Sequence, residues 1–250
     1  MRPSARRSRR TRIAGTLALC ALFWTAAPPD SVAQSATHPG LNAQLLVAAR
    51  QNDLVEVKSM LARGAAVDSR NRLGKTALLL ASEKGNDRLA EILVAAGADV
   101  NKASLEGVTP LMAAAYNGNP DVVRRLLKAG ARMEPVDRMR KSAAVYAAGQ
   151  GRAAVLLALL ESGLDVNATY EHDLTLLMWA AGQGHADVAR LLLARGARPE
   201  MRDDRGLTAS EIARTVPDVT TPSVGSNPTA LSPTTGSRSA TYACCVPTMM

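Results

Sequence analysis

The sequence repeats itself every 33 residues, and this period limits the possible folds more than any other feature. Three columns of residues recur in register along the chain. One column holds Thr or Ser and two hold glycine: Thr76, Thr109, Ser142, Thr175 and Thr208; Gly64, Gly97, Gly130, Gly163 and Gly196; Gly85, Gly118, Gly151 and Gly184. A fixed period between about 20 and 50 residues indicates an array of stacked repeats, each of which buries its apolar face against its neighbours.

Each repeat carries the start and stop signals of two helices. In the third repeat, the Thr109 hydroxyl can cap a helix, and Pro110 suits its first position because the missing N–H would be unpaired there. Gly118 can take the left-handed conformation that ends this helix. Asn119 and Pro120 then start a second helix, so the period predicts an all-α chain of helix pairs joined by turns.

This order of turn, helix, turn and helix over 33 residues resembles the ankyrin-repeat family. The closest motifs are GVTPL at 107–111 and ADVN at 98–101. The resemblance implies an all-α, ankyrin-type helix-turn-helix solenoid of five 33-residue repeats plus a partial sixth, spanning residues 41–215. The His of the family's TPLH motif is replaced throughout, so we expect any hydrogen bonds that it makes between repeats to be missing; the replacements are Leu79, Met112, Val145 and Met178.

Three of the repeats depart from this pattern. The fourth has Arg140 in the column of the turn glycine, and we expect it to be the weakest of the array. The fifth has Asp173 there, which tolerates a positive φ better than most residues. The sixth ends after one helix, which leaves the apolar face around Ile212 without its partner.

Residues 1–33 have the layout of a secretory signal peptide. Six Arg residues precede an apolar run over 13–27, and Ser31-Val32-Ala33 is a small-residue cleavage site. We expect cleavage after Ala33, a polar spacer over 34–40, and a periplasmic or secreted protein with no membrane span in the mature chain. The alternatives are twin-arginine export, a lipoprotein box ending at Cys20, an uncleaved anchor and an organelle transit peptide.

Residues 216–250 differ abruptly from the repeats. Pro, Ser and Thr make up 17 of these 35 residues, and only Asp218 and Arg238 are charged. Such a segment buries too little apolar surface to offset its ordering entropy, so we expect a disordered tail. Its adjacent Cys244 and Cys245 are either incidental thiols or a source of intermolecular disulfides. The tail is also open to the hypothesis that it is an out-of-frame end of a longer array.

The net charge of +8 does not indicate a nucleic-acid-binding face. Six of the 30 basic residues and one of the 22 acidic ones lie in residues 1–33, so 24 basic and 21 acidic residues remain. They are interspersed within every repeat, whereas binding to DNA or RNA requires a clustered basic stripe. We therefore expect no nucleic-acid partner.

Motifs of catalysis and metal binding are missing from the sequence. His38, His172 and His185 have no zinc-ligand spacing, and no GxSxG elbow or phosphate loop occurs. We expect no enzyme activity, catalytic residue, cofactor, metal or small-molecule substrate. Trp179 is interpreted first as a core residue and second as a contact residue.

The family resemblance implies a concave binding surface formed by the turn tips and the first helices. On this chain the register places Arg72, Leu73, Lys75 and Glu83 there, followed by corresponding residues of later repeats. Aromatic and apolar anchors dominate many interfaces. The candidate protein-binding residues are therefore Leu105, Val108, Tyr116, Met139, Tyr170 and Leu174. The predicted function is binding of an unidentified protein, and the alternative is an accessory or inhibitory subunit that regulates an exported enzyme by docking.

Overall fold

In the computed structural model of the chain, residues 39–215 are described. They form two compact units, of which the first contains residues 39–147 and 152–165 and the second contains 148–151 and 166–215. The expected signal peptide, most of the spacer and the Pro/Ser/Thr-rich tail therefore lie outside the described residues. Eleven α-helices and one short 3-10 helix occur within 39–215.

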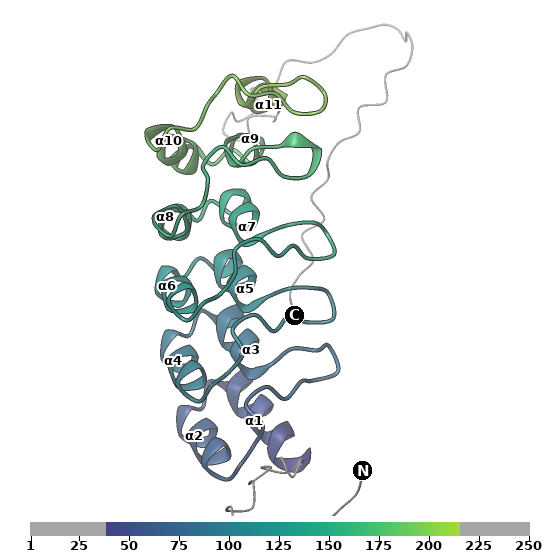
Figure 1. Ribbon diagram of the computed structural model, residues 1–250, viewed down its shortest axis with the longest axis vertical. Helices are drawn as coiled ribbons and strands as arrows, with labels where there is room; N and C mark the ends of the chain where they lie inside the picture. Colours follow the sequence, from purple (N-terminus) through teal and green to yellow (C-terminus); the bar gives the residue numbers. More distant parts are fainter. Residues whose placement is uncertain (1–38, 216–250) are drawn as a thin grey trace, which may run out of the picture. The chain divides into compact units, whose positions relative to one another are not determined.

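The first unit stacks helix pairs in two layers (Figure 1). The first helix of each pair packs on the first helix of the next, as α3 does on α1 and α5, and the second helices follow in the same way, as α6 does on α4 and α8. Two residues separate the first helix from the second in each of the first three pairs, so these pairs are tight hairpins. The helices are α1 (Pro39–Gln51), α2 (Leu54–Ala62), α3 (Ala77–Lys84), α4 (Asp87–Ala95), α5 (Pro110–Asn117), α6 (Pro120–Lys128) and α8 (Ala153–Glu161), and α7 (Ala143–Gly149) begins in this unit.

The second unit contains the 3-10 helix η1 (Glu171–Asp173) and helices α9 (Leu176–Gly182), α10 (Ala186–Ala194) and α11 (Ala209–Thr215). Helix α9 packs on both α10 and α11. Ile212 of α11 is buried, and a Cβ placed on Gly182 would lie 3.3 Å from its Cγ2 atom. The expectation that Ile212 lacks a packing partner is wrong, because the preceding first helix covers it.

The predicted caps are present at the helix starts. The Oγ1 atoms of Thr76, Thr109 and Thr175 accept hydrogen bonds from the third helical N–H at 3.2 to 3.3 Å. The Sδ atoms of Met112 and Met178 in turn accept the backbone N–H of the capping Thr at 3.5 and 3.4 Å. Two of the residues that replace the family's His thus contribute a weak acceptor to the cap.

A second set of hydrogen bonds joins neighbouring repeats at the start of each second helix. Asn86 Nδ2 donates to Asn52 Oδ1, and Asn119 Nδ2 donates to the Gly85 carbonyl at 2.5 Å. Arg152 Nε donates to the Tyr116 carbonyl at 3.2 Å. The residue that begins a second helix therefore reaches back to the end of the preceding first helix.

The loop before each first helix forms a tip. In four of the five tips, a side chain at the same repeat position accepts two backbone N–H groups of that tip. The tips comprise residues 70–75, 103–108, 136–141, 169–174 and 202–207 of repeats 2 to 6. In repeat 2, Asn71 Oδ1 accepts the N–H groups of Leu73 and Lys75 at 2.9 Å. The equivalent acceptors are Ser104, Asp137 and Asp203.

Neighbouring tips of the first unit are also bonded through their backbones. The Leu105 N–H donates to the Leu73 carbonyl at 3.1 Å, and the Arg138 N–H donates to the Glu106 carbonyl at 3.0 Å. The turn glycine is replaced by Arg140, whose φ is 55°, so the fourth tip keeps its shape with a non-glycine residue. Asp173 likewise has a φ of 55°, as predicted for this residue. That the fourth repeat is the weakest stays a prediction.

Gly74→Ala and Gly64→Ala form a matched pair that tests the close approach of the tips. Both glycines have positive φ, but a Cβ on Gly64 would meet nothing within 4 Å, whereas one on Gly74 would lie 2.8 Å from the Leu105 nitrogen. We expect Gly64→Ala to lower the free energy of unfolding by about 1 kcal/mol, the cost of a left-handed side-chain-bearing residue. Gly74→Ala should lower it by about 2 to 3 kcal/mol, because the tips must also separate. Equal losses in urea unfolding would contradict this contact.

Candidate protein-binding site

The tips of repeats 2 to 4 present exposed apolar side chains on a bonded frame. Leu73 is 56% exposed, Leu105 is 59% exposed and Met139 is 41% exposed. Their backbones are held by the side chains that accept two N–H groups in each tip and by the bonds between tips. Exposure of one apolar residue is ordinary, but three at successive tips of one unit form a defined apolar surface.

Val108 does not belong to this surface. Its side chain is 7% exposed, and its carbonyl accepts the Ser104 N–H at 2.9 Å where the tip closes. This closure places Val108 next to the capping Thr109, at the base of the tip, where its side chain joins the core. The prediction that Val108 is a contact residue is wrong in this respect, because the repeat register gives the position in the tip but not the direction of the side chain.

Tyr116 lies behind the tips in an aromatic cluster. Its ring packs edge-on against Tyr146, with centroids 5.7 Å apart and an interplanar angle of 85°. Tyr146 is buried and its hydroxyl donates to Asp137 Oδ2, while Asp137 Oδ1 accepts the N–H groups of Met139 and Lys141 at 2.9 Å. The half-buried Tyr116 is thus linked through Tyr146 to the fourth tip.

The electrostatics of Tyr146 follow from this burial. Loss of solvation raises the pKa of Tyr146 well above its usual range, and the hydrogen bond to Asp137 raises it further. Lys141 Nζ lies 5.9 Å from the centroid of the Tyr146 ring. Because the raised pKa keeps the phenol protonated, Tyr146 acts as a donor that holds Asp137 and thereby the fourth tip.

The remaining two candidates lie in the second unit. Tyr170 and Leu174 are half-buried, and the Tyr170 N–H donates to the Leu174 carbonyl at 2.9 Å. Between them, His172 has a φ of 61° and its Nδ1 lies 2.8 Å from Asp204 Oδ2 in the following tip. Leu105, Tyr116 and Met139 all lie in the first unit, and a binding band that includes all six residues stays a prediction.

Two further residues from the sequence have defined positions in the second unit. His185 makes no side-chain cap on α10, and its Nε2 atom lies 3.0 Å from the Gly149 carbonyl. Trp179 is half-buried, and its ring lies 3.9 Å from the place of a Cβ on Gly149. His185 therefore occupies the same repeat column as Asn119 and, like it, contacts the end of an earlier first helix.

Sequence reasoning missed several parts of the site. Leu73 was in register with the later tip residues but was not among the candidates, and Val136, which is also exposed, was not considered. Asp137 was missed as well, although the column that holds Asn71 and Ser104 is polar and signals a common role. Residues 39–215 hold no group of three or more His, Cys, Asp and Glu side chains suited to a metal ion. Within the same residues, the helices are all too short or too polar to cross a membrane.

Comparisons with known proteins cover most of the repeats. The family model of ankyrin repeats in three copies matches residues 45–137 and 78–170, and that of ankyrin repeats in many copies matches 157–213. A mitochondrial disaggregase of Bos taurus is 48% identical over 52 residues. These residues are 21% of this chain and 8% of that protein, so the likeness covers a small part of each.

Tyr146→Phe removes the hydroxyl that holds Asp137, and we expect it to lower the free energy of unfolding near neutral pH by about 1 to 3 kcal/mol. The contribution of Tyr146 to stability is fully present below pH of about 10, the pKa in the unfolded chain, and declines as the pH rises further. The difference between the parent protein and Tyr146→Phe should therefore shrink above that pH.

Tyr116→Phe is the matched control, since it keeps the edge-on ring contact with Tyr146. We expect its stability to stay close to that of the parent at every pH. Urea unfolding followed from pH 7 to about 11 measures both variants. A constant deficit of Tyr146→Phe across this range would contradict the role given to the phenol.

Proposed function

Since the chain belongs to the ankyrin-repeat family, whose repeats are generally protein–protein interaction modules, we propose that it binds a partner protein through its tips and first helices, without catalysis. The observation that carries the proposal is the apolar surface of Leu73, Leu105 and Met139 on successive tips. These side chains are exposed, although the backbones that bear them are fixed by hydrogen bonds.

A fixed frame favours binding because little order has to be gained when the partner docks. Each immobilised side chain or loop otherwise costs part of the interaction free energy. Asn71, Ser104 and Asp137 restrain the three tips, and the bonds between tips restrain their spacing. Only the side chains of the apolar surface then have to adapt to a partner.

We also propose that the protein acts outside the cytoplasm. The proposal rests on the Arg-rich start, the apolar run over 13–27 and the small residues Ser31, Val32 and Ala33. Cleavage after Ala33 would leave all described repeats in the exported chain. The partner is accordingly expected in the periplasm or outside the cell.

Leu105→Ser/Met139→Ser should abolish or strongly reduce capture of the partner. We expect the tagged full-length chain to retain one protein from the envelope fraction, and the double variant to lose it because two central apolar contacts are removed. Val55→Ser is the matched control, since Val55 is 79% exposed but lies on α2, away from the tips. Equal capture by parent and double variant would contradict the proposed surface.

Ala33→Trp tests the export proposal. Signal peptidases require small residues before the cleaved bond, so this change should block maturation. When the parent chain is expressed in a bacterial host, we expect periplasmic protein that begins at Gln34, as read by N-terminal sequencing. Parent protein that stays in the cytoplasm and begins at Met1 would contradict export.

A further inference from the structure

We infer that the segment bound by the tips of repeats 2 to 4 is acidic, with apolar side chains set among its carboxylates. The inference rests on the proposed function and names the chemistry of the partner. It follows from the charges that surround Leu73, Leu105 and Met139 within the first unit.

Basic residues outnumber acidic ones on these three tips. The cations are Arg70, Arg72, Lys75, Arg138, Arg140 and Lys141, and the anions are Glu106 and Asp137. Asp137 is buried under its own tip, where its oxygens accept two backbone N–H groups and the Tyr146 hydroxyl. Glu106 is therefore the one exposed carboxylate on the three tips, and the outer surface is positive.

The cations differ in whether they form ion pairs or hydrogen bonds within the protein. Lys75 Nζ pairs with Glu83 Oε1 at 2.7 Å, and Arg70 donates to the Ala103 carbonyl at 2.7 Å. Arg72 and Arg138 are exposed, and neither forms an ion pair with another described residue. These two guanidinium groups are available to a carboxylate, which they can bind through two parallel hydrogen bonds.

The free arginines are next to the exposed apolar residues in sequence and in space. Arg72 precedes Leu73, and Arg138 precedes Met139. The bonds from Leu105 N–H to the Leu73 carbonyl and from Arg138 N–H to the Glu106 carbonyl hold the three tips side by side. A segment that crosses the tips thus meets cationic and apolar side chains in turn, which matches carboxylates interspersed with apolar residues.

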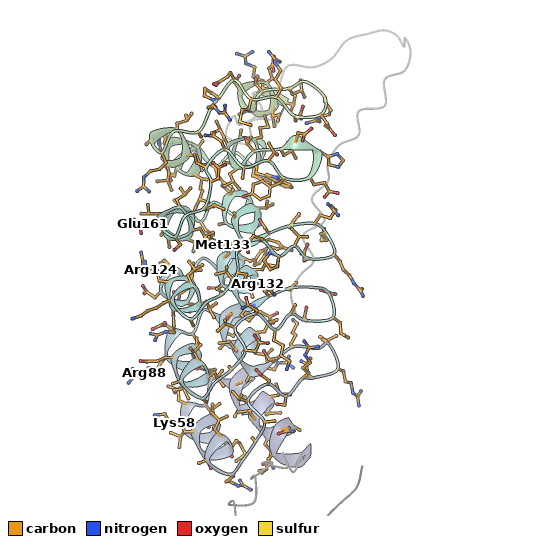
Figure 2. All side chains as sticks on the ribbon, in the orientation of Figure 1. Lys58, Arg88, Arg124, Arg132, Met133 and Glu161 are labelled. Atoms are coloured by element: carbon orange, nitrogen blue, oxygen red, sulfur yellow. The ribbon has the colours of Figure 1, made fainter. Side chains whose placement is uncertain are left out.

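The opposite side of the first unit has a different character. Figure 2 labels Lys58, Arg88 and Arg124, which lie on the second helices α2, α4 and α6, away from the tips. Arg88 pairs with Glu91 at 2.8 Å and Arg124 with Asp121 at 3.0 Å, so these two arginines are ion-paired within their own helices. On these second helices Arg88 and Arg124 are thus ion-paired, whereas Arg72 and Arg138 on the tips are not ion-paired with any described residue.

Two other occupants fit this surface less well. A nucleic-acid strand would need aromatic side chains for its bases, and it would meet the carboxylate of Glu106 at the middle tip. The chain's own tail offers one carboxylate, Asp218, over residues 216–250, which is too few to match the tips. An acidic, partly apolar segment of another protein satisfies both features of the surface.

The test measures binding of three labelled peptides of equal length to the full-length chain by fluorescence anisotropy. Leu alternates with Glu in the first peptide, with Lys in the second and with Ser in the third. We expect the Glu peptide to bind at least about tenfold more tightly than the other two, and its affinity to fall with added salt.

Arg72→Glu/Arg138→Glu should lower the affinity for the Glu peptide by about tenfold or more, because the charge at both arginine positions is reversed. Leu73→Ser/Met139→Ser should weaken it as well, since the apolar contacts are lost. Lys58→Glu on α2 is the matched charge control and should leave the affinity unchanged, and circular dichroism should show each variant folded.

Four outcomes would overturn the inference. Binding of the Ser or Lys peptide as tightly as the Glu peptide, with loss in the tip variants, would leave the proposed function intact and refute the acidic chemistry. Tighter binding of a single-stranded oligonucleotide would assign the surface to nucleic acid. Self-association that the tip variants abolish would assign it to a second copy of the chain. The absence of binding by all three peptides would refute the inference. Equal capture of a partner protein by the parent and by Leu105→Ser/Met139→Ser would separately refute the proposed function.

Discussion

The apolar face of each helix pair has to be covered by a neighbouring repeat, and the rest of the structure follows from this constraint. A pair of short helices has too little interior of its own, so Leu78 of α3 and Leu111 of α5 are buried where successive first helices meet. This packing brings residues 32 to 36 positions apart within hydrogen-bonding distance. The bonds at the tips and at the starts of the second helices then fix the spacing of the repeats.

The hydrogen bonds between repeats show that different side chains at one repeat position can make the same contact. In the first unit Asn119 and Arg152 both reach the end of an earlier first helix, and in the second unit His185 does so. A carbonyl accepts from an amide, a guanidinium or an imidazole, so the column keeps its role while its residue changes. At the position of the family's TPLH histidine, the Met112 Sδ atom accepts the Thr109 N–H as a weak acceptor.

The same stacking restrains the tips, through which we propose that a partner protein is bound. Buried Asp137, held by Tyr146, fixes a turn in which Arg140 stands where the second, third and sixth repeats have glycine. Met139 is exposed on that turn, as Leu73 is on an earlier one. Apolar side chains are thus presented on a restrained backbone, and the arginines beside them are the basis of the charge preference that we propose.

The sequence by itself determined the period, the helix pairs and their ends, because caps and stops depend on residues only a few positions apart. Thr76, Pro110 and the positive φ of Gly85 and Asp173 were all predictable in this way. It also assigned Leu105 and Met139 to tips and Tyr116 to a first helix, since the register alone distributes residues between these parts. Only the tertiary structure decided that Val108 and Ile212 are buried, that Tyr146 holds Asp137, and that Asn119 reaches Gly85. These facts depend on side-chain direction and on the distance between repeats, which a one-dimensional pattern does not contain.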